Sequence, residues 1–228
     1  MILTQNAERA PDRLAILYIE IKRDLISRGF ADEIDWQDQL SLEGITENDF
    51  LREAAWVIIS SGMSEYVVRK KFPDISRAFF NWQSAKVIRR HKTTCRKNAL
   101  SCFGHRAKID SIIFMASYVA ESGFKSVRDA VKDNGIEFLM QFPYLGPATA
   151  AHLAKNIGIP IAKQDRHLKR ISRLFGYSNP HDMCNAIAKT IDEKVSVIDL
   201  VFWRFATLQR NYLERLALLL KQFDMIPT

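Results

Sequence analysis

The residues best placed to do chemistry lie between positions 138 and 176, where an aspartate follows a turn that contains proline and glycine. This aspartate, Asp165, stands in the run Gln-Asp-Arg-His-Leu-Lys-Arg at residues 164–170. A carboxylate can orient a water molecule as a nucleophile, and it can stabilise positive charge that develops on a neighbouring carbon. The same residue suits a simpler role, the N-cap of a helix that begins at Arg166. The two roles are compatible.

The turn before this aspartate, residues 142–146, leads into a new helix that opens at Pro147. Proline at the first helical position loses only an N–H that would have no partner anyway. We expect Gly146 to take the positive φ that such a sharp reversal often requires. The helix would then point the N–H groups of Ala148 and Thr149 outward from its positive end, which binds a phosphate without any charged side chain. Junctions of this kind also occur as plain connections between helices.

Apolar residues at helical spacing predict the elements that must position these groups. Such stripes run through residues 14–25, 50–58, 109–119, 168–174, 186–191 and 200–223. No stretch alternates apolar and polar residues in the way that a half-buried strand does. We therefore predict an all-α fold, a two-lobed helical bundle with a helix-hairpin-helix motif. Residues 1–48 and 156–228 would form a terminal lobe, and residues 49–155 a central lobe that ends in the hairpin helix.

Two charged stretches interrupt the helical pattern. Residues 30–48 are acidic and irregular, and we interpret them as a connector between the first helix and the body of the protein. Residues 89–106 are strongly basic and carry Arg89, Arg90, Lys92, Arg96, Lys97 and Arg106. The simple interpretation of this basic run is a solvated loop, and the alternative is a rim of phosphate contacts.

Composition limits the classes of function. The 228 residues carry 33 Lys and Arg against 26 Asp and Glu, a formal charge of +7 that suits either ordinary solubility or a polyanionic partner. The three cysteines form no CxxC pair, so we expect no disulfide framework, no structural zinc and no iron–sulfur cluster. Walker loops, His/Glu zinc motifs and serine elbows are absent. We find neither a signal peptide nor an apolar run of the roughly 18 residues that a membrane span needs, and we expect a cytoplasmic, nucleoid-associated or nuclear protein.

Around the turn and the aspartate, the chain resembles the helix-hairpin-helix DNA glycosylases of the HhH-GPD superfamily. Their hairpin reads roughly Leu-Pro-Gly-hydrophobic-Gly-x-x-Thr-Ala, against Phe-Pro-Tyr-Leu-Gly-Pro-Ala-Thr-Ala at residues 142–150, and their aspartate follows in a context close to that of Asp165. Weaker similarity extends over residues 50–205. The resemblance implies an enzyme of base excision repair that removes a damaged or mispaired base from duplex DNA. Asp165 would assist hydrolysis of the N-glycosidic bond.

The resemblance also implies roles for residues near the hairpin and beyond it. The DNA contacts that it implies fall on Tyr144, Leu145, Gly146, Ala148, Thr149, Lys169 and Arg170. Backbone carbonyls of Phe142 and Leu145 would hold a monovalent cation, and no other cofactor is expected. Met63 would fill the gap that the departing base leaves in the stack, and an ordinary loop methionine is the equal alternative. Trp56 and Trp203 would line the base pocket, although packing in the core or against the hairpin is the favoured interpretation of these two residues.

Departures from the family pattern carry information of their own. Tyr144 replaces the first glycine of the hairpin, and Gly62 stands where many relatives have a glutamine. Ala148 occupies the position of the lysine that forms an imine in members that also cleave the DNA backbone. The resemblance therefore implies a monofunctional enzyme and favours alkylated or mispaired bases over oxidised ones. A bifunctional enzyme would need another amine, and Lys155 and Lys163 are the candidates.

Two other classes of function remain open at this point. A non-catalytic DNA-binding module could use the same hairpin to recognise a lesion, but it would not need Asp165 in its Asp-x-His setting. A helical protein–protein scaffold would show no DNA affinity, whereas either DNA-binding hypothesis predicts an affinity that falls steeply with salt. We expect the protein to act on duplex DNA as a monomer.

Overall fold

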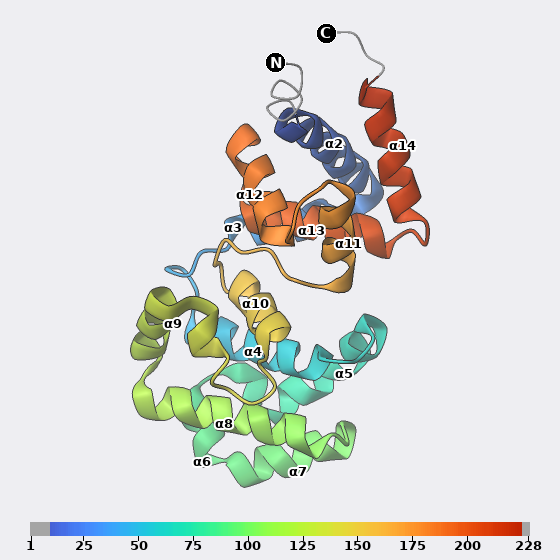
Figure 1. Cartoon of the computed structure of the whole chain (residues 1–228). Coiled ribbons are helices and arrows are strands. Elements are labelled where there is room, and N and C mark those ends of the chain that lie inside the picture. The colour runs from blue at the N-terminus through green and yellow to red at the C-terminus, as the bar shows by residue number, and fades with distance from the viewer. Residues whose placement is uncertain (1–9, 225–228) are drawn as a thin grey trace. The chain divides into compact units, whose positions relative to one another are not determined.

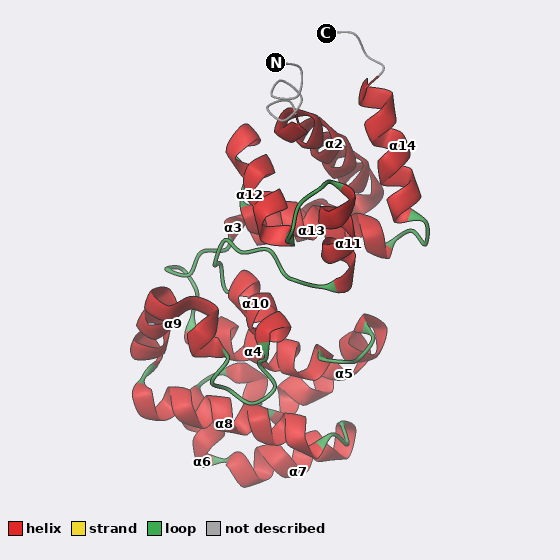
Figure 2. Cartoon of the chain, viewed as in Figure 1, coloured by secondary structure: helices red, strands yellow, loops and turns green. Residues whose placement is uncertain are grey.

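The computed structural model describes residues 10–224, and the regular elements in this range are helices (Figure 2). No strand occurs in that range, so the all-α prediction is confirmed. Short irregular helices η1 and η2 span Ile26–Phe30 and Phe80–Trp82. The α-helices are α2 (Ala10–Leu25), α3 (Ala31–Gln39), α4 (Glu47–Ser60), α5 (Glu65–Ala78), α6 (Ala85–Arg90), α7 (Lys92–Cys102), α8 (Arg106–Ser122), α9 (Phe124–Leu139), α10 (Pro147–Asn156), α11 (Arg166–Leu174), α12 (Pro180–Ile191), α13 (Val195–Thr207) and α14 (Tyr212–Asp224).

The chain divides into two compact units. The terminal unit comprises residues 1–39 and 160–228, and the hairpin unit comprises residues 40–159. The sequence-based boundaries are residues 48/49 and 155/156, whereas the structure divides the chain at 39/40 and 159/160. Each unit has a central helix that packs against several of its other helices.

Helix α13 is the centre of the terminal unit and packs against α2, α3, α11 and α12 (Figure 1). Its side chains are apolar almost all round, which is the pattern of a helix covered on several sides. Val197, Val201 and Phe202 are fully buried, and the Phe202 ring lies 5.9 Å from that of Tyr18 on α2.

Helix α4 is the centre of the hairpin unit, where it packs against α5, α6, α8 and α10 (Figure 1). The Thr46 side chain caps its first turn by accepting the N–H of Asp49. Buried Glu53 accepts the side-chain amide of Asn156 at 2.9 Å, and this bond ties the hairpin helix α10 to α4. Burial raises the pKa of Glu53, while its neighbour Arg52 acts in the opposite direction.

The structure corrects both interpretations of the charged stretches. Residues 31–39 of the acidic stretch form helix α3, because Ile34 and Gln37 lie one turn apart and are both buried. Most of the basic stretch is also helical, in α6 and α7, so the prediction of a loop was wrong. Cys95 and Ala99, one helical turn apart, bury one face of α7 while most of its charged side chains face solvent.

Gly158, which follows α10, is a position that only glycine can occupy. Its φ is +91°, and a Cβ atom there would lie 2.4 Å from the carbonyl carbon of Ser41. Any side chain would therefore displace backbone as well as strain the residue itself. This close approach fixes how the chain leaves the hairpin helix.

Within residues 10–224, no helix is long and apolar enough to cross a membrane. The same part of the chain contains no group of three or more His, Cys, Asp or Glu side chains arranged to hold a metal ion.

Candidate nucleic-acid interface and active site

The predicted hairpin joins α9 to α10 and is held in place by its own buried side chains and by a hydrogen bond to α8. Phe142 and Leu145 are buried, and the Leu145 N–H donates to the Phe142 carbonyl at 3.1 Å. The hydroxyl of Ser111 on α8 donates to the Pro143 carbonyl at 2.6 Å. Two apolar side chains and a bond to a neighbouring helix therefore hold the turn in place.

The backbone of the hairpin differs from the prediction at one point. Gly146 has φ −76° and ψ −179°, so the expectation of a positive φ there was wrong. The positive φ falls on Tyr144, at +66°, because this residue occupies the tight centre of the turn between Phe142 and Leu145. The left-handed conformation costs a residue with a side chain about 1–2 kcal/mol.

Contacts of Tyr144 offset this strain. Its carbonyl lies 2.9 Å from the hydroxyl oxygen of Thr149, which donates to it from the first turn of α10. Its ring packs edge-on against His105, with 5.9 Å between ring centroids. The turn thus keeps the backbone shape that glycine allows while presenting a partly exposed tyrosine.

The first turn of α10 is open to solvent and suited to a phosphate. Gly146 and Ala148 are exposed, and the N-cap Gly146 offers no side-chain cap. The first backbone bond of the helix runs from the Ala150 N–H to the Gly146 carbonyl at 2.8 Å. The N–H groups of Ala148 and Thr149 therefore have no acceptor inside the helix, and they lie at its positive end.

Backbone carbonyls at the turn provide the kind of ligand that a monovalent cation takes. The Phe142 carbonyl accepts one N–H, from Leu145, and so keeps a second lone pair. The carbonyls of Pro143 and Tyr144 already accept hydroxyl groups. Each of these carbonyls therefore keeps one lone pair, so hydrogen bonding does not single out the Phe142 carbonyl as the cation ligand.

In the terminal unit, Asp165 is the N-cap of α11, as the sequence predicts. Its Oδ1 atom accepts the N–H groups of His167 and Leu168, both at 2.9 Å. Its Oδ2 atom lies 3.6 Å from the Nζ atom of Lys163, and the side chain is 16% exposed. One oxygen thus caps the helix, while the other pairs with the Lys163 ammonium.

Lys163 is held beside Asp165 by helix α13. Its backbone N–H donates to the buried carboxylate of Asp199 at 2.8 Å. Its ammonium group lies 5.3 Å from the ring centroid of Trp203, one turn further along the same helix. The guanidinium of Arg204 also lies near this ring, at 4.8 Å from its centroid, so two cations contact Trp203.

Helix α11 also carries His167 and the two predicted DNA-contact residues, Lys169 and Arg170. His167 packs edge-on against Tyr212, with 5.3 Å between centroids, and burial lowers its pKa. The imidazole thus packs against a neighbouring aromatic ring, which suits a structural role. Lys169 and Arg170 are both exposed and can approach a polyanion.

The other predicted residues lie in the hairpin unit. Trp56 on α4 is half-buried, packs edge-on against Phe72 at 5.1 Å and lies under the guanidinium of Arg69. Met63 is half-buried in the turn after α4, where its N–H donates to the Ser60 carbonyl at 3.0 Å. The predicted site residues are thus divided: the hairpin, Trp56 and Met63 belong to one unit, and Asp165, Lys169, Arg170 and Trp203 belong to the other.

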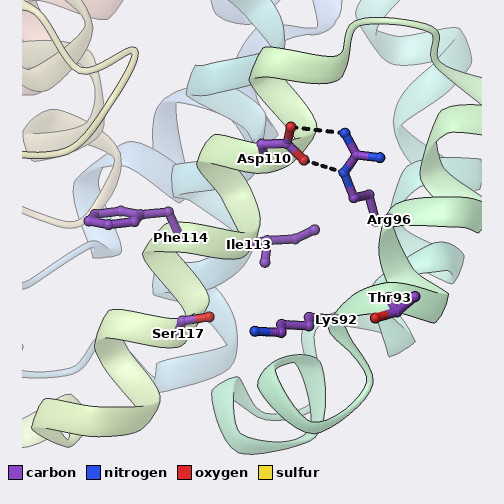
Figure 3. Close-up of a pocket in the computed structure, with 7 residues that line it drawn as sticks. All are labelled: Lys92, Thr93, Arg96, Asp110, Ile113, Phe114 and Ser117. Atoms are coloured by element: carbon purple, nitrogen blue, oxygen red, sulfur yellow. Dashed lines mark hydrogen bonds and ion pairs between the residues drawn. The ribbon is translucent and has the colours of Figure 1, made fainter.

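Part of the basic stretch lines a hollow between α7 and α8 (Figure 3). Its volume is about 400 Å³. Arg96 and Asp110 form a bidentate ion pair at 2.6 and 3.1 Å on one side, and Lys92 extends toward Ser117 on the other. Phe114 is half exposed here, and its ring also packs against Phe142 of the hairpin at 6.4 Å.

These features define an all-helical fold of two units, with a helix-hairpin-helix in one and a capping aspartate in the other. The crystal structure of the Methanocaldococcus jannaschii 8-oxoguanine glycosylase/lyase, in complex with a 15mer DNA containing 8-oxoguanine, is similar with a TM-score of 0.57. The similarity covers 84% of this chain and 98% of that chain at 19% sequence identity. It shows that the two proteins share a fold. No family model and no curated protein sequence matches the chain.

Proposed function

We propose that the protein is a DNA glycosylase that removes a damaged or mispaired base from duplex DNA, as a monomer acting in base excision repair. The observation that carries the proposal is the arrangement of Asp165, whose Oδ1 atom is fixed by two backbone N–H groups while Oδ2 lies 3.6 Å from the Lys163 ammonium on a side chain that is 16% exposed. Helix capping alone needs only the first of these oxygens. The shared fold with a glycosylase/lyase supports the same function.

In this mechanism, the hairpin holds the DNA backbone while the target base leaves the stack. A phosphate binds the N–H groups of Ala148 and Thr149 at the start of α10. The backbone carbonyls of Phe142 and Leu145 would hold a monovalent cation, which would add positive charge near the DNA backbone. Extrusion of the base costs a few kcal/mol. As the C1′–N bond breaks, the carboxylate of Asp165 stabilises the positive charge on the sugar and orients the water that attacks C1′.

We propose that the product is an abasic site in an intact strand. Ala148 offers no amine at the position where hairpin enzymes with lyase activity carry a lysine. The similar structure contains 8-oxoguanine, whereas the missing lysine favours alkylated or mispaired bases, so both groups belong in the test.

A second candidate function, a combined glycosylase and lyase, is favoured by one observation. The Lys163 amine lies 3.6 Å from Asp165, which would accept its proton. The neutral amine would attack C1′ as the base departs, and the C1′–O4′ bond would then break to open the sugar ring and form a protonated imine. Loss of a C2′ proton would follow, with cleavage of the C3′–O bond and release of the 3′-phosphate. Both the ion pair and the Trp203 ring stabilise the protonated ammonium, which opposes this route.

The test uses duplex oligonucleotides that each carry one modified or mispaired base. Each reaction is divided, and half is treated with hot alkali. Strand breaks only after alkali would establish a hydrolytic glycosylase and its substrate. Breaks without alkali would favour the second candidate, and borohydride trapping of Lys163→Arg beside the wild type would show whether Lys163 forms the imine. Salt-sensitive DNA binding without any base release would contradict both enzymatic functions and would support a non-catalytic DNA-binding module instead.

A further inference from the structure

The hollow between α7 and α8 has no part in the proposed function. All of its lining residues belong to these two helices, so it lies outside the hairpin and the first turn of α10. Its volume of about 400 Å³ falls within the range of binding pockets, which runs from about 300 to 1,000 Å³. We call it the α7–α8 hollow.

Short side chains between longer ones leave this space. Thr93 on α7 and Ser117 on α8 both line the hollow and have little volume. At one end, Arg96 and Asp110 connect the two helices through their bidentate ion pair, a contact of defined geometry. The α7–α8 hollow is therefore preformed, which lowers the entropy lost on binding.

Apolar side chains of α8 form part of the lining. Ile113 lies between the ion pair and Lys92 (Figure 3), and Phe114 is the next residue along the helix. Phe114 is 50% exposed, more than any other phenylalanine whose side chain the structure describes. Single exposed apolar residues are common on protein surfaces. An exposed ring at a concave site differs from these, because one side chain of a partner can enter the hollow and cover it.

The surface around the hollow is basic. Residues 85–97 carry six Lys and Arg and no Asp or Glu. Two of the six, Arg89 and Arg96, form ion pairs with carboxylates of α8. The other four are exposed and have no ion-pair partner among the residues that the structure describes: Lys86, Arg90, Lys92 and Lys97. This surface therefore attracts an anionic partner, with a strength that falls as salt increases.

Charge and shape together favour an acidic protein segment over duplex DNA. The phosphates of a duplex would meet the basic residues, but its bases are stacked inside and its backbone offers no large apolar group for the hollow. A peptide supplies both features on neighbouring residues. Its carboxylates complement Lys92 and the basic residues near it, and one large apolar side chain fills the space beside Phe114.

We propose that the α7–α8 hollow is a docking site for an acidic segment of a partner protein. The segment places one large apolar side chain in the hollow and its carboxylates against the basic residues around it. Because the Phe114 ring also packs against Phe142, the docked segment lies beside the hairpin. The proposal goes beyond the proposed function and does not depend on DNA binding or base release.

Fluorescence polarisation with the full chain would measure affinity for a labelled peptide that contains a run of Asp residues and one Phe. One control peptide has Ser in place of Phe, and another has Asn in place of each Asp. Burial of a large apolar side chain contributes about tenfold or more to affinity, so the Ser peptide should bind more weakly by that factor. The Asn peptide should lose both affinity and salt dependence, because it carries no carboxylates.

Variants of the hollow provide the second part of the test. Ser117→Phe and Thr93→Phe fill the hollow from opposite helices without changing its charge, so each should weaken binding of the Phe-containing peptide about tenfold or more. Lys92→Glu should also weaken it, by reversing a charge beside the hollow. Lys189→Glu makes the same charge change at an exposed position of the terminal unit and should bind the peptide as the wild type does. All four variants should keep the helical circular dichroism spectrum.

The outcomes separate the possible occupants. Loss of peptide affinity in the two filled variants, with unchanged affinity for an intact duplex, would support the docking site. Equal loss of duplex affinity in these variants would assign the hollow to the DNA interface and overturn the proposal. Equal binding of the Phe and Ser peptides would also overturn it, as would the absence of any peptide binding by the wild type. Because the peptide assay contains no DNA, its failure leaves the proposed function intact, and failure of base release leaves the docking site intact.

Discussion

Substitution of Asp165 separates its structural role from its chemical one. As the N-cap of α11, Asp165 accepts two N–H groups through a single oxygen, Oδ1. Asparagine keeps a carbonyl oxygen that can accept these bonds and is about as good an N-cap as aspartate. Alanine cannot accept them. We therefore expect Asp165→Ala to lower the free energy of unfolding by about 1–2 kcal/mol. Asp165→Asn should lose less than about 1 kcal/mol, for the missing charge at the helix N-terminus.

The chemical role predicts a different pattern. Both substitutions remove the charge that would stabilise the developing sugar cation, so both should slow base release by about 100-fold or more, the scale found when one electrostatic contact to a transition state is deleted. Affinity for intact duplex should change little. Stability is measured by urea unfolding, and base release by single-turnover reactions with excess enzyme followed by alkali.

A matched control tests whether lost stability alone explains lost activity. Asn179 caps α12 in the same unit by accepting the N–H of Asp182 at 2.9 Å. Asn179→Ala should lose about as much stability as Asp165→Ala and still release the base. Full activity in Asp165→Asn would refute the catalytic assignment. Equal stability of the Asp165→Asn and Asp165→Ala variants would refute the capping argument.

Three further predictions concern the hairpin unit. Because Tyr144 has a positive φ, Tyr144→Gly should unfold at a higher urea concentration than Tyr144→Ala, by about 1 kcal/mol in free energy, and the reverse order would contradict the strain. Ala148→Asp should stabilise α10 slightly but weaken duplex binding about tenfold or more by repelling the phosphate, while Asn134→Asp, an exposed control with the same charge change, should bind normally. Burial raises the pKa of Glu53 above its ordinary 4.5, so the folded state holds that proton more tightly and the stability it contributes is lost as pH rises through the folded pKa. Chemical unfolding at several pH values should therefore show wild type losing stability relative to Glu53→Gln as pH increases above 4.5, and a constant difference would contradict this.

The sequence by itself predicts the features that depend on local spacing. Apolar periodicity predicts most of the helices, because one buried face repeats every three or four residues whatever that face packs against. The cap at Asp165 and the open first turn of α10 also follow from neighbouring residues alone. The resemblance over residues 142–170 therefore led to the right fold.

Tertiary structure decides the features that depend on distant residues. The ring contact that helps to offset the strain at Tyr144 comes from His105, which is far away in the chain. The place of Lys163 beside Asp165 depends on α13, whose Asp199 lies 36 residues away. Lys108 looks like any surface lysine in the sequence, yet it is buried against carbonyls 47 and 49 residues earlier. Contacts of this kind depend on which helices pack together, and the spacing of residues along one helix does not contain that information.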